Sequence, residues 1–402
     1  LLGAGITIFL GLVSQTRVLD GVLNPTYFVQ YIDFNVIFLL VSMMIIVNIT
    51  TRSGVFSYLA NELLKMTKGH PVLILIALGI FTAVVSAFLD NVTTVILIMP
   101  ITFAIARKLE IDPIPYLLTE VFASNIGGTA TLIGDPPNII IGSAAGFSFM
   151  DFVNNLTLVV AVILIAVLAV MVLFFRKKLA TTAEKMKEAA NIDNTHTITD
   201  VPLMVRSMIV LALVILGFVT HDITHIETCV AAMLGASFLL LFEKPTDILR
   251  DVEWNTIFFF IGLFIIIGGL EASGGIALMA NWIIKITEGS QAATSLLILW
   301  GSGFISGIID NIPYTATMSP MLVEIQKTMG ADYTTPLWWC LSLGACLGGN
   351  MTMIGAAANV IVSESAAKEG HPMFFLRFMK YGVIVVAISL IISSLYINLR
   401  YM

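Results

Sequence analysis

The amino-acid sequence has little charge. Only 11% of its 402 residues are Asp, Glu, Lys or Arg, against about 25% in a typical soluble chain, and 58% are hydrophobic. Apolar stretches of about 20 residues recur along the chain, which is the length of a helix that crosses a lipid bilayer. We therefore predict an all-α polytopic membrane protein, with the lipid bilayer as one of its partners.

Cysteine and histidine are also scarce. The three cysteines form no CxxC pair, so neither a zinc knuckle nor a disulfide framework is indicated. The five histidines fall in expected loops or at the ends of expected spans, which leaves no buried base and no histidine metal site. These scarcities argue against a membrane enzyme, and we expect no cofactor and no nucleic-acid partner. The cysteines are Cys229, Cys340 and Cys346, and the histidines are His70, His196, His221, His225 and His371.

Apolar stretches divide the chain into candidate spans and half-spans. No charged segment followed by a small-residue cleavage site is present, and because the first residue is Leu1, the natural chain could begin upstream, with or without a further helix. The long polar connection at 176–203 separates two halves. The stretches fall at 1–16, 34–51, 72–89, 91–106, 115–147, 152–175, 204–220, 226–242, 254–271, 291–309, 312–326, 334–366 and 374–398.

Lysine and arginine positions predict the orientation of the spans, because cytoplasmic loops carry an excess of both. We place the linker 176–203 in the cytoplasm and let 72–106 and 291–326 each return to the side on which they start. Sixteen of the 20 basic residues then face the cytoplasm. Those that face outward are Arg17, Lys285, Lys327 and Arg400. We therefore predict a multi-pass protein of the cell (inner) membrane with a cytoplasmic linker.

The sequence matches itself when it is displaced so that Phe34 lies over Trp254. Segment 34–65 then lies over 254–285 with 10 identities in 32 positions, and a second Asp-Asn pair lies over the first. With one more residue inserted, 126–141 lies over 347–362. By the charge count the two copies face opposite ways, which is the inverted-topology repeat of many secondary transporters.

The repeat predicts the domain organisation. A first repeat occupies 1–175, the cytoplasmic linker follows at 176–203, and a second repeat occupies 204–402. Each repeat is expected to hold a re-entrant helical hairpin and a broken transmembrane helix. The hairpins are expected at about 72–107 and 291–327, and the broken helices at about 115–147 and 334–366.

Each Asp-Asn pair interrupts an apolar run and is followed by a short apolar arm. Asn91 to Ala106 and Asn311 to Gln326 are 16 residues each, whereas a full span needs about 20. Two complete spans joined by a short outer turn would give the same charge count, so both arrangements stay open. At a hairpin tip Asp would cap the second arm, but a carboxylate inside a membrane also marks an ion or proton path.

A second polar cluster, "GTATLIGDPPN", begins at Gly128. Pro136 and Pro137 cannot continue an incoming helix and suit the first turn of a new one, with Asp135 either as its cap or as an ion ligand. The second copy has three alanines in place of the Asp-Pro-Pro triplet. One extra carboxylate on one side fits a site for a cation or proton better than a symmetric anion clamp.

Two tips and two breaks would aim four helix N-termini at one central cavity. We predict that substrate and coupling ion bind there, with sodium as a possible metal at the two Asp-Asn pairs. The predicted site residues are Asp90, Asn91, Thr93, Thr94, Thr131, Gly134, Asp135, Asn138, Asp310, Asn311, Thr315, Thr352, Gly355 and Asn359.

The motifs "LDNVTTVILIMP", "SNIGGTATLIGDPPNIII", "IDNIPYTATM" and "LGACLGGNMTMIGAAANVIV" resemble the ion transporter superfamily, and within it the arsenite-permease and P-protein branch with its citrate transporter-like domain. The resemblance covers essentially the whole chain. It implies two inverted repeats, a scaffold domain that forms a homodimer, and elevator-type movement of a transport domain.

Three functions stay open. The first is a secondary active transporter of a small inorganic solute, coupled to protons through the tip aspartates. The resemblance points to export of arsenite, antimonite or a related anion. The second is a sodium/proton antiporter, for which carboxylates and neutral oxygens are enough. The third is an anion channel, since helix N-termini attract anions, although carboxylates at both tips oppose it.

Overall fold

The computed structural model describes residue 4 and residues 29–191 and 197–402. Within these residues the secondary structure is helical, with no strand. The expected span at 1–16 lies outside the described residues except for Ala4, as do residues 192–196 of the linker.

Helices follow one another through both halves of the chain. The first half contains α4 (Phe34–Arg52), α5 (Val55–Met66), α6 (Pro71–Ser86), α7 (Asn91–Leu109), α8 (Ile114–Gly128), α9 (Pro136–Ala145) and α10 (Phe149–Phe175). Then come α11 (Ala183–Ala190), α12 (Val201–Val219), α13 (His221–Thr224), α14 (Thr228–Leu240) and α15 (Pro245–Arg250). The second half contains α16 (Trp254–Ala272), α17 (Gly275–Ile286), α18 (Gln291–Ser306), α19 (Asn311–Met329), α20 (Ala331–Gly348), α21 (Ala357–Lys368) and α22 (Phe375–Tyr401).

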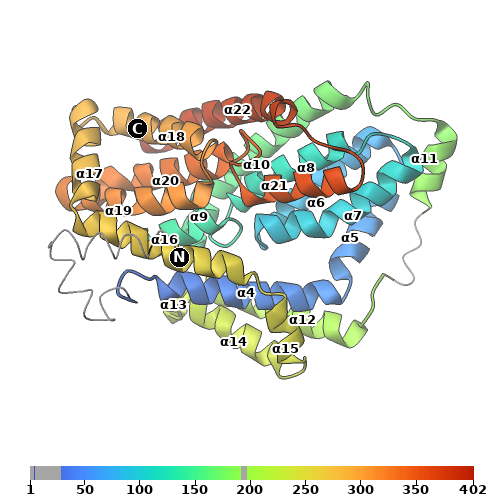
Figure 1. Ribbon diagram of the computed structural model, residues 1–402, viewed down its shortest axis with the longest axis horizontal. Helices are drawn as coiled ribbons and strands as arrows, with labels where there is room; N and C mark the ends of the chain where they lie inside the picture. Colours follow the sequence, from blue (N-terminus) through green and yellow to red (C-terminus); the bar gives the residue numbers. More distant parts are fainter. Residues whose placement is uncertain (1–3, 5–28, 192–196) are drawn as a thin grey trace.

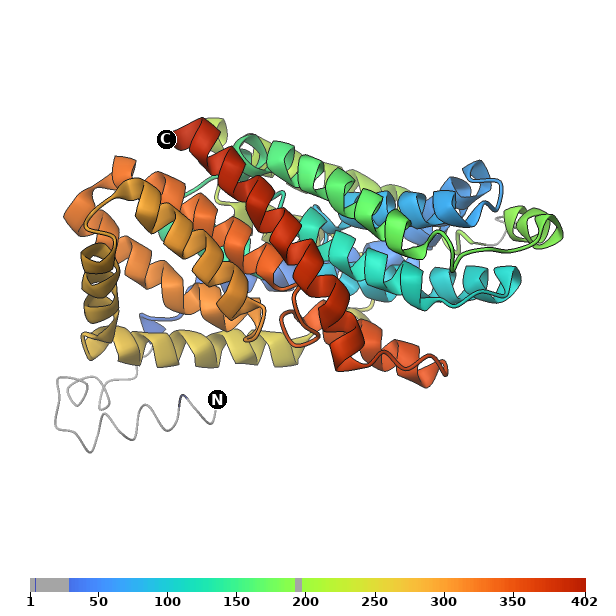
Figure 2. The same cartoon turned by 90° about the horizontal axis from the view of Figure 1, so that it is seen from above.

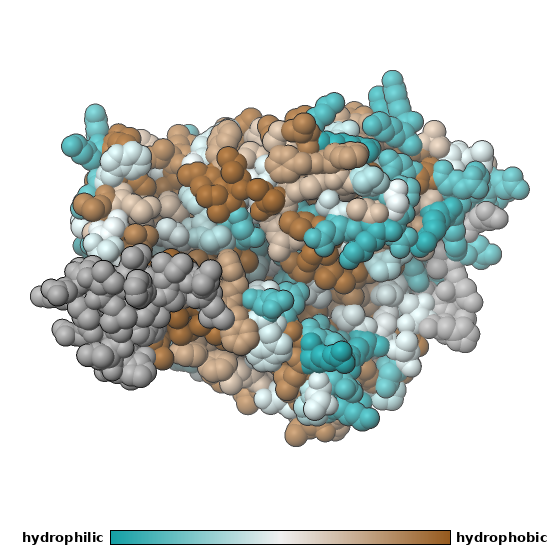
Figure 3. Space-filling view, viewed as in Figure 1, coloured by the Kyte–Doolittle hydropathy of each residue, from teal (hydrophilic) through white to brown (hydrophobic). Residues whose placement is uncertain are grey.

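Six of the described helices are long and apolar enough to cross a membrane: α4, α7, α10, α12, α16 and α22. Apolar side chains cover the middle of the face in Figure 3, and hydrophilic ones gather at its right end, where α11 lies, and over α15. The prediction of an all-α polytopic membrane protein is therefore confirmed.

The helix boundaries repeat in the register found in the sequence. The displacement that places Phe34 over Trp254 also places both ends of each helix from α4 to α7 over the ends of its counterpart from α16 to α19. The start of α21 lies one position beyond this register from the start of α9. α7 and α19 each have 19 residues, three more than the predicted arms, because the helices continue through the basic residues that were taken as their ends. At about 1.5 Å per residue each is about 28 Å long, so shortness alone does not distinguish a hairpin arm from a span.

Two layers are visible in Figure 1. The lower layer contains α4, α12, α14 and α15, and the upper one contains both helix pairs α6–α7 and α18–α19 together with α8, α20, α9 and α21. The pair α6–α7 occupies the right part of the molecule and α18–α19 the left part, while α10 and α22 cross over one face in Figure 2. The turns of the two pairs therefore approach the middle from opposite ends.

Helices α8 and α20 form the centre of the core, because every residue of α8 and all of α20 from Pro336 onward are buried. Glycines let them approach their neighbours closely. A Cβ on Gly127 would lie 2.1 Å from the carbonyl oxygen of Ala83 on α6, and one on Gly348 would lie 2.5 Å from that of Gly303 on α18. Small residues at helix contacts are typical of membrane helix packing.

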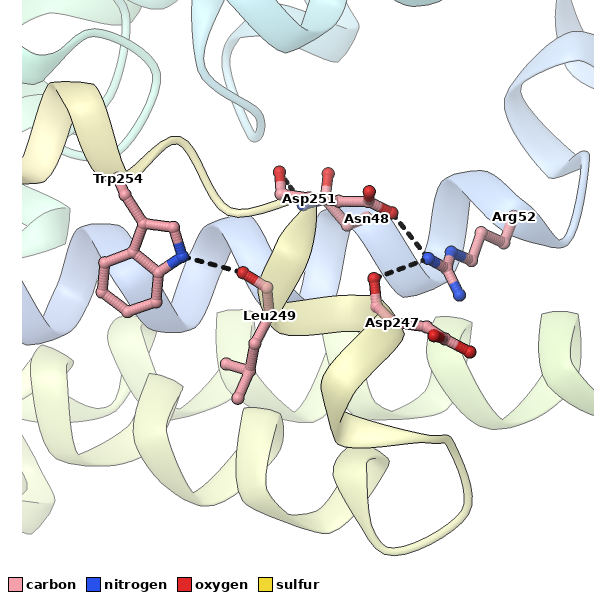
Figure 4. A network of polar contacts seen from close by, with 6 residues as sticks. All are labelled: Asn48, Arg52, Asp247, Leu249, Asp251 and Trp254. Carbon is pink, nitrogen blue, oxygen red and sulfur yellow. Dashed lines mark hydrogen bonds and ion pairs between the residues drawn. The ribbon is translucent and has the colours of Figure 1, made fainter.

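A polar network fastens the end of α4 to the turn between α15 and α16 (Figure 4). Arg52 Nη2 lies 2.6 Å from Asp251 Oδ2 and donates to the Asp247 carbonyl at 3.0 Å. Asn48 Nδ2 donates to the Asp251 carbonyl at 3.0 Å, and the Trp254 indole donates to the Leu249 carbonyl at 2.8 Å. These contacts fix where α16 begins, beside the cavity described below.

Gly348→Ala is expected to lower stability by about 1–3 kcal/mol, because the added methyl group would force α20 and α18 apart. Gly301→Ala is the matched control: a Cβ there meets nothing within 4 Å, so its effect should be neutral or stabilising by up to about 1 kcal/mol. Thermal unfolding of the detergent-solubilised protein measures both. Equal melting temperatures for the two variants would contradict the close packing.

Candidate functional site

A cavity of about 310 Å³ lies between the two layers. The start of each of α7, α9, α19 and α21 reaches it from the upper layer, while α4 of the lower layer and the start of α16 close its other side. It is lined by Leu40, Met44, Asp90, Asn91, Val92, Asp135, Pro136, Glu253, Asn255, Thr256, Asn311, Ile312, Ala357 and Ile361.

Asp135 is the polar centre of this cavity. It occupies the N-cap position of α9 with extended backbone, yet its side chain makes no capping hydrogen bond. Instead its carboxylate accepts from Asn91 Nδ2 at 3.4 Å and from Asn311 Nδ2 at 3.4 and 3.3 Å. Asp135 is fully buried, and its two partners come from the tips of the two helix pairs. Of the two interpretations left open, the geometry therefore disfavours a capping side chain.

Asp90 and Asp310 do cap helices. Asp90 Oδ1 accepts from the Thr93 backbone N–H at 2.9 Å, and Asp310 Oδ1 accepts from that of Ile312 at 2.9 Å. A carboxylate at a helix N-terminus satisfies an unpaired donor and interacts favourably with the helix dipole. Asp90 also lines the cavity, whereas Asp310 is not among the described residues that line it.

A chain of buried amides extends from the first tip into the second half. Asn91 Nδ2 donates to Asn125 Oδ1 at 3.0 Å, and Asn125 Nδ2 donates to Asn350 Oδ1 at 2.8 Å and to Asn359 Oδ1 at 3.1 Å. These four residues are at most 5% exposed. The contacts of Asn125 join the first half of the chain to the second, so the two halves share one polar core. Neither Asn125 nor Asn350 was predicted from the sequence.

Two further predicted residues, Asn138 and Asn359, stabilise the helix breaks, which are the interruptions between α8 and α9 and between α20 and α21. Asn138 Nδ2 donates to the carbonyls of Thr129 and Thr131 at 3.1 and 2.8 Å, and its Oδ1 accepts from Ser342 at 2.6 Å. Asn359 Nδ2 donates in the same way to the carbonyls of Gly349 and Thr352 at 2.7 and 2.8 Å. Backbone groups inside a membrane protein need such partners wherever a helix is interrupted.

The breaks also dock onto the helix pairs. Thr131 Oγ1 donates to the Ala87 carbonyl, and Thr352 Oγ1 donates to the Gly307 carbonyl at 2.6 Å, both at the ends of α6 and α18. A Cβ on Gly134 would lie 2.5 Å from the carbonyl oxygen of Ser86. In the second half the Gly355 carbonyl accepts from the Asn311 N–H at 3.3 Å.

The three remaining predicted residues are threonines near the tips. Thr94 is fully buried and donates to the Asp90 carbonyl at 2.9 Å, while Thr93 is half-buried and does not line the cavity. Thr315 is also fully buried, and its hydroxyl has no hydrogen-bond partner in the described part of the chain. It follows Asn311 by four positions and so lies on the same face of α19.

Three cavity residues come from the start of α16 and were not predicted as site residues. They are Glu253, Asn255 and Thr256, and Thr256 donates to Glu253 Oε2 at 3.0 Å. In the sequence they mark the polar edge of an apolar span and carry no motif. The nearest signal is the repeat, which aligns Asn255 with Asn35, another polar residue at a span start.

The charge around the cavity is of one sign. Its lining contains the carboxylates of Asp90, Asp135 and Glu253, with three asparagines and one threonine, and no Lys, Arg or His. The carboxylates do not converge on one point, since no group of three or more metal-ligating side chains is found among the described residues. Such a lining favours cations and neutral hydrogen-bonding solutes over anions.

A polar cavity inside a multi-pass helical fold is typical of membrane transporters, and the comparisons with known proteins identify the chain as one. The chain belongs to the citrate transporter family, whose family model matches residues 1–344. It is 44% identical over 373 residues to an uncharacterized transporter of Mycobacterium tuberculosis, with 92% of this chain and 87% of the relative aligned. It is 42% identical over 374 residues to the 46 kDa membrane protein of Mycobacterium leprae, with the same coverage.

A more distant relative has a longer chain. The P protein of Mus musculus is 31% identical over 452 residues, which cover 92% of this chain and 54% of that protein. Together with the family match, it confirms the resemblance to the ion transporter superfamily.

Asn138→Ala should destabilise the protein by at least about 2 kcal/mol, because it would leave buried carbonyls of the first break without a donor. Asn255→Ala is the control, since the side chain of this exposed cavity asparagine makes no hydrogen bond in the described part of the chain. Thermal unfolding in detergent measures both variants. A loss of stability for Asn255→Ala as large as that for Asn138→Ala would contradict the stabilising role of Asn138 at the first break.

Proposed function

We propose that the chain is a secondary active transporter that couples the movement of a small inorganic solute to protons or sodium. The observation that carries the proposal is the cavity lined by three carboxylates and no basic group. Intramembrane carboxylates are costly and typically mark ion or proton paths. The coupling ion would bind at Asp135 and Asp90, with Asp310 as a neighbouring carboxylate at the second tip.

Arsenite or antimonite is the leading solute. Arsenous acid is neutral near physiological pH, so it would not be repelled by carboxylates. The Oδ1 atoms of Asn91 and Asn311 accept none of the hydrogen bonds found among the described residues, because both amides direct their nitrogens at Asp135. These oxygens would accept from a hydroxyl-bearing solute or ligate a sodium ion. The buried Thr315 hydroxyl, without a partner in the described part, would add a third group.

The family's description names citrate, which the cavity supports less well. A trianion would enter a site with three carboxylates and no compensating side-chain cation. An anion channel meets the same objection. A sodium/proton antiporter stays the second candidate, because carboxylate and amide oxygens are the ligands that hard cations prefer.

The two halves would form inverted repeats with re-entrant hairpins. Both tips bond to Asp135, which is buried at the centre, and α7 and α19 run from there to opposite ends of the molecule (Figure 1). Four helix starts then surround one cavity, as in transporters built from inverted repeats. The chain would lie in the cell (inner) membrane with residues 176–203 in the cytoplasm.

The proposal extends to elevator-type movement. The cavity lies at the boundary between the lower layer, which would be the scaffold, and the upper layer, which would carry the solute. Short helices α5 and α17 connect α4 and α16 to the helix pairs and would act as arms. A homodimer through the scaffold is part of this proposal.

Asp135→Asn and Asp310→Asn should each abolish proton-driven or sodium-driven uptake in proteoliposomes while leaving expression intact. Neither variant can bind or release a proton at the altered group. Asp332→Asn, which neutralises an exposed aspartate at the start of α20, should transport normally. Flux is measured for arsenite, sodium, chloride and citrate under imposed gradients. Coupled transport at the wild-type rate by Asp135→Asn would refute the proposed ion site.

Met66→Cys and Ile286→Cys test the opposed orientation. Both residues are exposed, at 79% and 53%, and they end α5 and α17 at positions that the repeat aligns, while the three native cysteines are buried. A membrane-impermeant maleimide should label Met66→Cys only from the cytoplasmic side and Ile286→Cys only from the other side. Labelling of both from the same side would rule out an inverted repeat.

A further inference from the structure

A groove of about 500 Å³ runs between α12 and α14, two helices at the lower edge of the molecule in Figure 1, and shares no lining residue with the central cavity. The residues of α12 that line it include four at helical spacing: Arg206, Val210, Val214 and Gly217. At the end opposite Arg206 the helices approach closely, because a Cβ on Gly217 would lie 3.2 Å from Ala231 Cβ on α14. The rest of the lining is apolar.

Arg206 is the one charged residue among those that line the groove. Its Nε donates to the Pro202 carbonyl at 3.3 Å, and its guanidinium carbon lies 4.7 Å from the centre of the Phe242 ring. A guanidinium has five N–H donors, and no carboxylate among the described residues is within ion-pair distance of it. An apolar groove thus ends at a cation with free donors.

The length of the groove matches one leaflet of a bilayer. Arg206 and Gly217 are eleven residues apart on α12, which is about 16 Å at 1.5 Å per residue. Half of a bilayer's hydrocarbon core is about 15 Å. Arg206 also belongs to the basic residues that the charge distribution assigns to the cytoplasmic side, where anionic lipids are concentrated.

We propose that the groove binds an anionic phospholipid of the cytoplasmic leaflet, with its phosphate on Arg206 and one acyl chain along α12 and α14. A planar guanidinium with several free donors matches phosphate oxygens. A second copy of the chain fits the groove less well, so the homodimer proposed above would use another part of the scaffold. α12 and α14 contain no Asp or Glu, so symmetric packing of these helices would bring two Arg206 side chains together at one depth.

Native mass spectrometry of the full chain in detergent tests the proposal, with phosphatidylglycerol or phosphatidylcholine of identical acyl chains added. The wild type should retain phosphatidylglycerol more strongly than phosphatidylcholine, because the choline cation offsets the phosphate charge. Arg206→Gln should weaken retention of phosphatidylglycerol about tenfold or more and that of phosphatidylcholine less. Arg250→Gln is the matched control, because it removes an exposed charge from the same predicted side, away from the groove. Elution as one symmetric peak on size-exclusion chromatography verifies folding of each variant.

Ala231→Leu provides the second arm, because its larger side chain fills the end of the groove opposite Arg206 without changing charge. It should reduce retention of both lipids and leave the mass of the assembly unchanged. The proposal is overturned if Arg206→Gln and Arg250→Gln retain phosphatidylglycerol equally. It is also overturned if Ala231→Leu keeps the lipid but changes the oligomeric state, which would identify a second copy as the occupant.

Discussion

The contact between Asp135 and the two tip asparagines is the constraint on which the arrangement depends. A buried carboxylate is unfavourable unless donors reach it, and here the donors come from α7 and α19, which lie in opposite halves of the chain. Both helix pairs must therefore end near the middle of the molecule, and α9 must begin there too. The breaks at Gly128–Pro136 and Gly348–Ala357 follow from the same requirement, because an unbroken helix could not present Asp135 at that point.

Much of the fold could be predicted because its signals are local or periodic. Apolar runs of bilayer length identified the spans, Pro136-Pro137 identified a helix start, and the Asp-Asn pairs identified the turns before α7 and α19. The self-match anticipated that the helix boundaries of the first half would recur in the second. The length of the arms was wrong by three residues, because Arg107, Lys108 and Lys327 stay helical beyond the apolar segment.

The candidate site was predictable only in part, because its composition is decided by long-range contacts. The sequence offered Asp135 as a cap or a ligand with equal weight, and only the approach of Asn311, 176 positions away, distinguishes the two. Glu253 and Thr256 enter the cavity because the Arg52–Asp251 contact fixes the start of α16, and no short motif encodes that. Asn138 and Asn359 have side chains that could ligate an ion or solute, yet their amide nitrogens donate hydrogen bonds to backbone carbonyls at the helix breaks.

The repeat duplicates the backbone of the site but not its charge. The position that corresponds to Asp135 in the second half is Ala356, a buried methyl group beside the start of α21. The two halves thus have similar backbone around the site, but Asp135 has no acidic counterpart in the second half. In this chain the carboxylate stands at one of the two corresponding positions only, so the donors of both halves, Asn91 and Asn311, meet at the same side chain.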